Sequence, residues 1–151
     1  MKRSSRDSWW PAALARRVLL AMALLTGLAA WAEDDALYRD LGGEEGIARI
    51  VEGMVDRAYA DPRIQKKFDG VNPKALKESL RRQFCALSGG NCAYEGETMK
   101  KSHAHLAVDK ADFNALVEDL QLAMDEQKVP FTVQNRLLAL LAPMHRDIIT
   151  R

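Results

Sequence analysis

The chain has few of the residues that catalytic and metal-binding sites most often use. Its 151 residues include two cysteines and three histidines. No His-Glu-x-x-His motif is present and no pair of carboxylates accompanies the histidines, so a zinc site has little support. No serine or cysteine is framed by turn glycines, which argues against the usual nucleophile motifs. Internal repeats, low-complexity stretches and long linkers are also missing from residues 33–151.

Strands are not expected either, because apolar and polar residues nowhere alternate convincingly. Apolar residues instead recur at helical spacing. A first stripe lies between Gly42-Gly43 and Asp61-Pro62, and a second follows Asn72-Pro73. Asparagine before proline is a good helix start, since the side chain caps the helix and proline suits its first position. The first stripe consists of Ile47, Ile50, Val51, Met54, Val55 and Ala58; the second of Leu76, Leu80, Phe84 and Leu87.

Two further helices are predicted in the C-terminal half. One spans about residues 110–127 with Asp109 as its cap, and the other begins near Phe131. Pro143 should kink the last helix, because proline removes a backbone donor and clashes with the preceding turn. Between them these patterns predict an all-α domain of four substantial helices. The residues of the third helix expected to be buried are Phe113, Leu116, Val117, Leu120 and Met124.

The N-terminus has the composition of an export signal. Five basic residues and one acid precede an apolar run from Val18 to Ala30, and Ala30-Trp31-Ala32 places small residues around a cleavage point. This order is typical of a secretory signal peptide, and the run is shorter than the ~20 residues that a membrane helix needs. We expect a signal peptide over residues 1–32 and a periplasmic or secreted domain over residues 33–151, no longer attached to the membrane. Arg16-Arg17 leaves open whether the general or the twin-arginine route is used.

The predicted mature domain is mildly acidic, because the signal carries five of the 22 basic residues but one of the 21 acids. A domain without a basic patch gives no electrostatic reason to expect a nucleic-acid partner, so a small ligand is favoured. Export would place Cys85 and Cys92 in an oxidising compartment, where a disulfide can persist. Gly89-Gly90 supplies a turn between them. A disulfide is therefore favoured over a buried Cys85 with a free Cys92.

Residues 90–109 interrupt the helical pattern and contain two of the three histidines. One short helical turn is expected around residues 100–104, with His103 and His105 in or next to it. Histidine is the commonest metal ligand, yet histidines in loops are also common without one. His145 lies on the last helix beside Arg146 and Asp147 and is expected to face solvent. The residues alone leave open whether the segment binds a cofactor.

An ordered set of short motifs runs through residues 36–149. The motifs are Leu37-Tyr38-x-x-Leu41-Gly42-Gly43, Ala60-Asp61-Pro62-Arg63, Phe68, Gly89-Gly90, Tyr94-x-Gly96, Met99-x-x-x-His103 and Phe113. Each motif is weak by itself, but the ordered set is specific and resembles the group I truncated haemoglobins. This resemblance implies a two-over-two helical sandwich around haem b, and a segment that is barely helical before the proximal histidine.

The resemblance assigns the iron ligand to His103, four residues after Met99 and ten before Phe113. His105 is the rival candidate, but two residues along a helical turn it points away from the iron side. Lys100 and Lys101 could pair with the haem propionates or remain solvated, and exposed pairs contribute little. The remaining residues that the resemblance places around haem are Phe68, Leu76, Leu80, Phe84, Met99 and Phe113.

The chain departs from this family on the distal side. The family's aromatic pair, which ends in a tyrosine donor, corresponds to Met54 and Val55, and a second donor position is Leu80. Loss of the donated hydrogen bond should raise the oxygen dissociation rate by about one to two powers of ten. Tyr59, one turn after Val55, could replace the donor but is favoured as a packing residue near Phe68. Gln83 is expected to point away from the pocket.

Three functions follow from the resemblance and the residues. The first is reversible binding of a diatomic gas (O2, NO or CO) to haem iron, with an electron donor as a further partner that keeps the iron ferrous. An apolar distal pocket favours CO and NO over oxygen. The second is a haem enzyme for NO dioxygenation or peroxidase-like detoxification, which needs distal donors that this chain lacks. The third is a helical interaction module without haem, which the ordered motifs disfavour.

Overall fold

A computed structural model describes residues 35–151, and the predicted signal peptide lies outside them. All regular secondary structure in this part of the chain is helical, which confirms the predicted all-α class. The elements are α2 (Ala36–Asp40), α3 (Gly43–Ala60), η1 (Gln65–Phe68), α4 (Pro73–Leu87), α5 (Met99–His103), α6 (Lys110–Glu126), α7 (Phe131–Leu141), η2 (Ala142–Met144) and α8 (His145–Ile148).

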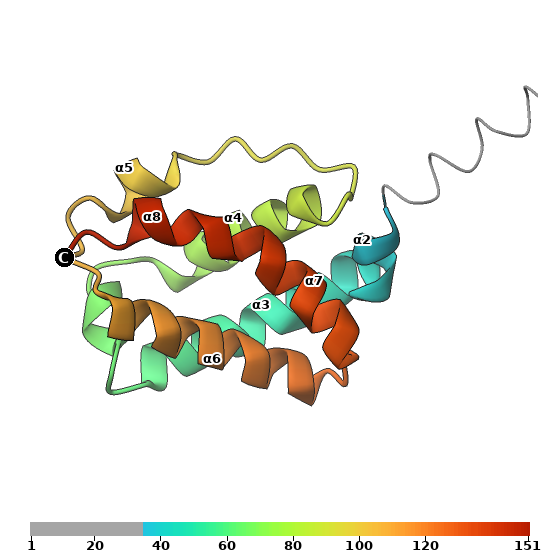
Figure 1. The fold of residues 1–151 in the computed structure, drawn as a ribbon, viewed down its shortest axis with the longest axis horizontal. Coiled ribbons are helices and arrows are strands. Elements are labelled where there is room, and N and C mark those ends of the chain that lie inside the picture. The colour runs from blue at the N-terminus through green and yellow to red at the C-terminus, as the bar shows by residue number, and fades with distance from the viewer. Residues whose placement is uncertain (1–34) are drawn as a thin grey trace, which may run out of the picture. The chain divides into compact units, whose positions relative to one another are not determined.

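The four long helices form two layers, with α3 and α4 behind and α6 and α7 in front in the view of Figure 1. Helix α3 packs against both α4 and α6, and so connects the layers. The short α5 lies beside α8 at the edge of the domain. This arrangement brings the histidine-bearing segment next to the C-terminal helix.

Helix ends follow the capping residues that the sequence contains. The Asn72 side chain accepts hydrogen bonds from the backbone N–H groups of Lys74 and Ala75 at 2.9 and 3.2 Å. At α6, the backbone N–H of Asp112 donates to the Asp109 carboxylate, and the N–H of Asp109 donates to the Asp112 carboxylate, both at 2.9 Å. Such reciprocal bonds satisfy N–H groups that have no partner inside the helix. The predicted starts of both helices are confirmed.

The core centres on the predicted stripe of α3, all of which is buried. It meets Leu120, Ala123 and Met124 of α6 and Leu137 of α7. Each fully buried aliphatic side chain stabilises the fold by roughly 1.5–3 kcal/mol. The prediction that five residues of α6 are buried is only partly right, because the three in the N-terminal half of the helix are only half-buried. Leu120 and Met124 are buried, whereas Phe113, Leu116 and Val117 are half-buried.

A disulfide links α4 to the segment that leads to α5. Cys85 and Cys92 are bonded, with their Cα atoms 5.9 Å apart. Between them the chain turns back, and the Gly90 N–H donates to the Cys85 carbonyl at 2.8 Å. A Cβ at Gly90 would lie 2.5 Å from the Cys85 sulfur, so this turn requires glycine. The disulfide therefore fixes the start of the loop that carries Tyr94 and ends at Met99.

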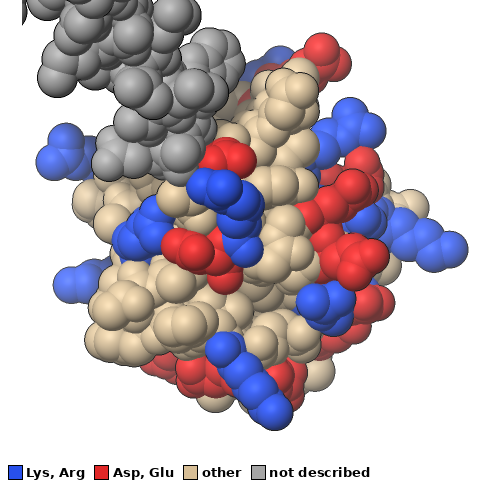
Figure 2. Space-filling model, turned by 90° about the vertical axis from the view of Figure 1, so that its right-hand side faces the viewer, with Lys and Arg blue, Asp and Glu red and all other residues tan. Residues whose placement is uncertain are grey.

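The surface carries charges of both signs. Figure 2 shows blue and red side chains interleaved on the face that it draws. Some are paired, as in Arg39 with Asp35 at 3.0 Å and Arg136 with Asp40 at 2.7 Å. None of the helices described here has both the length and the hydrophobicity to span a membrane.

Asp119 is a buried acid whose charge works against folding. It is 4% exposed and its Oδ2 atom has no hydrogen-bond partner. Burial, together with the Asp61 carboxylate nearby, raises the pKa of Asp119 above its ordinary value of 3.8. Because the folded-state pKa is the higher one, this group favours the fold most at low pH, and the advantage is lost as pH rises through the raised pKa.

We therefore expect Asp119→Asn to stabilise the protein at pH 7 by about 1 kcal/mol, because the amide has no charge to desolvate. The gain should shrink towards pH 4, where the parent carboxyl becomes protonated. Urea unfolding of both proteins at several pH values measures this. A variant less stable than the parent at pH 7 would contradict the assigned cause.

Candidate functional site

An apolar cleft runs between α4, α6 and the C-terminal helices. It consists of three adjoining hollows that share residues, so that one wall continues into the next. The half-buried side chains of α6 face this cleft, which explains why they are not fully covered. The cleft residues include Met54, Leu80, Gln83 and Phe84 from α3 and α4; Met99; Phe113, Leu116 and Val117 from α6; Met144 and Ile148; and Phe68 at the η1 end.

His103 is the last residue of α5, one turn after Met99. Its Nδ1 atom lies 2.8 Å from the Met99 carbonyl oxygen. A carbonyl oxygen can only accept, so Nδ1 carries the proton and Nε2 keeps its lone pair. An imidazole held in this way is oriented and ready to bind a metal through Nε2. His103 is half-buried, and Met99, which accepts its hydrogen bond, lines the cleft.

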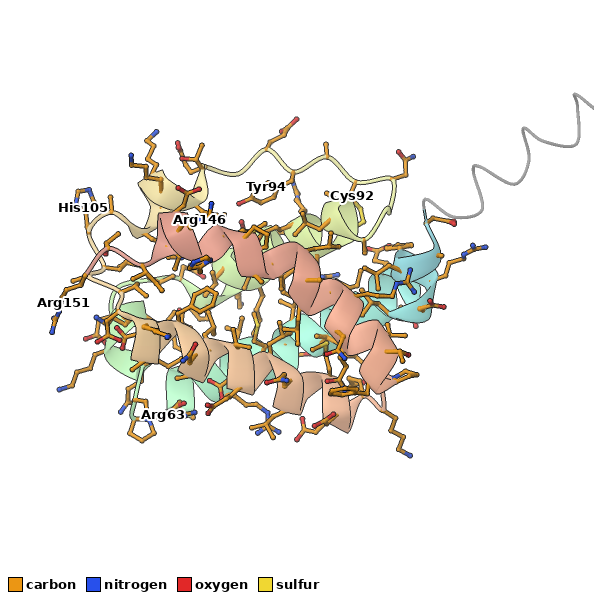
Figure 3. All side chains as sticks on the ribbon, in the orientation of Figure 1. Arg63, Cys92, Tyr94, His105, Arg146 and Arg151 are labelled. Carbon is orange, nitrogen blue, oxygen red and sulfur yellow. A yellow bond between two sulfur atoms is a disulfide. The ribbon has the colours of Figure 1, made fainter. Side chains whose placement is uncertain are left out.

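The other two histidines are placed differently. His105 is exposed, and Figure 3 shows it pointing outward from the segment after α5. His145 is exposed as predicted, with its Nδ1 donating to the Ala142 carbonyl at 2.8 Å. Within residues 35–151, no group of three or more His, Cys, Asp or Glu side chains could hold a metal ion. A single histidine with a free ring nitrogen suits a haem, because the porphyrin itself supplies four nitrogen ligands to the iron.

Gln83 corrects the sequence analysis. It was expected to point away from the pocket, yet it is 7% exposed and lines the cleft. Its Nε2 lies 3.5 Å from the Met144 sulfur and 3.8 Å from the Met99 sulfur. The prediction took Leu76, Leu80 and Phe84 as the residues of α4 that line the pocket. Gln83 lies three residues after Leu80, and residues so spaced are neighbours on one helix face.

Comparison with known families identifies the fold of this chain. A family model described as bacterial-like globin matches residues 36–150. The chain belongs to this globin family. A group 1 truncated hemoglobin, GlbN, of Mycolicibacterium paratuberculosis is 29% identical over 119 residues, which cover 79% of this chain and 88% of the relative. A group 1 truncated hemoglobin of Tetrahymena pyriformis is 23% identical over 113 residues, covering 75% and 93%.

Solved structures agree on the fold. The truncated hemoglobin of Tetrahymena pyriformis in its Fe(III) form superposes with a TM-score of 0.73 at 23% identity, covering 76% of this chain and 98% of that one. The 2/2 hemoglobin of Synechococcus sp. PCC 7002 gives 0.71 at 22% identity, covering 76% and 98%. The globin is thus a group I truncated globin with the two-over-two fold, which confirms the expected family. Haem iron is the cofactor of this family, and diatomic gases bind there.

The structure of this globin brings together most of the residues that sequence reasoning placed around haem. Leu76 packs against the core from α4 and is half-buried. Val55 is 1% exposed and lies in the core beside Met54, which itself faces the cleft. Lys100 is exposed, and Lys101 pairs with Glu97 at 2.7 Å. The predicted cleft residues found in its lining are Met54, Phe68, Leu80, Phe84, Met99 and Phe113.

Lys67 connects the η1 corner to the segment after His103. Its ammonium group donates to the carbonyls of Leu106 at 3.2 Å and Ala107 at 2.7 Å, and pairs with Asp112 at 3.1 Å. Although burial alone would raise the pKa of Asp112, the Asp109 N–H and the Lys67 ammonium hold it below its usual range. Sequence reasoning missed this link, since a lysine within Gln-Lys-Lys-Phe has the pattern of an ordinary solvated residue.

Tyr59 is a packing residue. Its ring lies 5.1 Å from that of Phe68, and its hydroxyl donates to the Val71 carbonyl at 2.8 Å. Burial raises the pKa of the hydroxyl, which keeps it protonated as a donor. The hydroxyl therefore holds the chain between η1 and α4 and does not reach into the cleft.

Tyr59→Phe should leave the oxygen dissociation rate of the haem-loaded globin unchanged and lower its stability by about 1 kcal/mol, the net value of one hydrogen bond. Stopped-flow oxygen release and urea unfolding measure the two effects. Faster oxygen release in the variant would show that the hydroxyl contacts the gas after all.

Proposed function

We propose that this globin binds haem b through Nε2 of His103 and reversibly binds a diatomic gas on the opposite face. The observation that carries this proposal is the hydrogen bond from His103 Nδ1 to the Met99 carbonyl. It fixes the tautomer and the orientation of the imidazole before any cofactor arrives. Haem supplies the iron to which the gas binds, and the residues of this chain hold, orient and enclose it.

The apolar walls suit the body of a porphyrin. Phe68 of η1 and Phe113 of α6 line one hollow of the cleft, and Leu80 and Phe84 of α4 line the adjoining one. A dry pocket of this kind excludes water from the bound ferrous iron and so protects it from oxidation. Both cysteines of the sequence are in the disulfide, so neither can form a thioether bond to haem. This favours haem b, which is held without covalent bonds to cysteine.

The distal side lacks donors at the positions that the family resemblance assigns to them. Val55 and Leu80 have neither an N–H nor an O–H group in their side chains. Any hydrogen bond to the gas must therefore come from another side chain of the cleft. Chemistry that needs donors at these two positions, such as peroxidase-like detoxification, is therefore disfavoured relative to reversible binding.

The absorption spectrum of the purified protein tests the proposal. After addition of haem we expect a Soret band, a five-coordinate spectrum when reduced and a shifted band with CO. Acidified organic solvent should extract the haem intact. A protein that gives no Soret band with added haem would contradict the function, and haem that stays on the chain would contradict the assignment of haem b.

We further propose that the protein is exported. The composition of residues 1–32 and the disulfide support this, because disulfides persist mainly in oxidising compartments. N-terminal sequencing of the protein from its native cell should find Glu33 as the first residue of the exported form. A full-length protein that begins at Met1 and remains in the cytoplasm would contradict export.

A further inference from the structure

The Gln83 amide is a buried donor without a strong acceptor. Both partners of its Nε2 atom are thioether sulfurs, those of Met144 at 3.5 Å and Met99 at 3.8 Å. Sulfur in methionine is a weak acceptor, so these contacts compensate poorly for the water that the amide has lost. Since both neighbours are acceptors only, the nitrogen end of the amide is the one that faces them. The two N–H groups of the amide can therefore exchange these sulfur acceptors for another acceptor inside the cleft at little cost in free energy.

Within one hollow of the cleft the amide is the single polar side chain, because the other described residues that line this hollow, Met54, Leu80 and Phe84 among them, are apolar. The second hollow that Gln83 lines also contains polar residues, namely Tyr94, Glu97 and Thr98. Leu80 lies three residues earlier on α4, so the two side chains share a face of that helix. Leu80 occupies the position where the family resemblance places a donor. Gln83 therefore carries an amide on the same face of α4, about one turn further along.

We propose that Gln83 is the residue that donates a hydrogen bond to the diatomic ligand, and so stabilises bound oxygen relative to bound CO. This proposal rests on the proposed function. On ligand entry the N–H exchanges a weak sulfur acceptor for a stronger oxygen acceptor. Oxygen gains more than CO from this exchange, because bound oxygen carries more negative charge and accepts hydrogen bonds better. In this globin the donor on α4 is therefore Gln83, three residues after the position of Leu80, and the hydrogen bond to the ligand is retained.

The Gln83→Met variant tests the role, because methionine has similar length and volume but no N–H. In the haem-loaded variant we expect oxygen to dissociate about tenfold faster, which corresponds to about 1.4 kcal/mol, with the CO dissociation rate little changed. The C–O stretching frequency of the CO complex should rise, since a donor no longer polarises the ligand. Gln121→Met, the same change on α6 outside the cleft lining, serves as the matched control and should behave like the parent.

A packing role for Gln83 would alter haem retention without moving the C–O frequency. Unchanged oxygen release and an unchanged C–O band in Gln83→Met would therefore overturn the proposal. If that variant fails to hold haem, the parent protein provides the test. The side-chain N–H signals of Gln83, labelled with 15N, should shift between the CO-bound and oxygen-bound forms, which are both diamagnetic, and identical signals in the two forms would overturn the proposal. A parent without a Soret band contradicts the proposed function, whereas a normal Soret band without a Gln83 effect contradicts the donor role alone.

Discussion

His103→Ala should abolish stable haem uptake, whereas His105→Ala should bind haem like the parent protein. The physical reason is that the Nδ1 of His103 is bonded to the carbonyl of Met99, a residue that lines the cleft, and this bond leaves Nε2 free as a ligand. His105 is exposed and has no comparable anchor among the hydrogen bonds of the described chain. Without a bound nitrogen, haem would be retained by apolar contacts alone.

Titration of each variant with haem, followed by the Soret band and by transfer of haem to an acceptor globin, measures this difference. A third variant, His103→Gly, separates ligation from folding. Imidazole added to the solution can enter the space left by the side chain, and the five-coordinate spectrum should then return. Haem uptake by His103→Ala at the parent level, or its loss in His105→Ala, would overturn the assignment.

The helical framework could be predicted because its determinants are local. Asn72 with Pro73 sets the start of α4, and Asp109 sets that of α6, through side-chain bonds to N–H groups two or three residues away. The apolar stripe of α3 keeps helical spacing through its whole length and is buried throughout. Pro143 separates α7 from α8, as the missing N–H requires. Neither capping nor periodicity depends on contacts between distant residues.

The cleft was less predictable because its lining depends on such contacts. Gln83 meets Met144, 61 residues later, and only that packing shows that the amide turns inward. Lys67 bonds carbonyls 39 and 40 residues away, in a segment whose path no local pattern specifies. For α6, periodicity identified Phe113, Leu116 and Val117 as inward-facing. It could not show that these three stay half-buried in a cleft, while Leu120 and Met124 are buried.

Gly46→Ala should strongly destabilise the protein. An added Cβ at Gly46 would lie 2.0 Å from the Leu41 carbonyl oxygen and 2.9 Å from its carbon. Non-bonded heavy atoms prefer separations of about 3.5–4.0 Å, and a backbone carbonyl cannot rotate away as a flexible side chain can. The turn between α2 and α3 must therefore move. We expect a loss of about 3 kcal/mol in unfolding free energy and a fall in Tm of roughly 10 °C.

Gly70→Ala is the matched control. Gly70 has a positive φ, of 78°, but no atom lies within 4 Å of its added Cβ, so only backbone strain of about 1 kcal/mol applies. Circular dichroism during thermal and urea unfolding compares the stability of the two variants. Equal losses of stability would contradict the prediction, because they would show that the Leu41 carbonyl moves away from the added Cβ at little cost.

The comparison also bears on function, because α3 carries both Gly46 and Met54. If the N-terminal end of α3 shifts in the Gly46→Ala variant, the Met54 side of the cleft should shift with it, and haem should dissociate faster from Gly46→Ala than from Gly70→Ala.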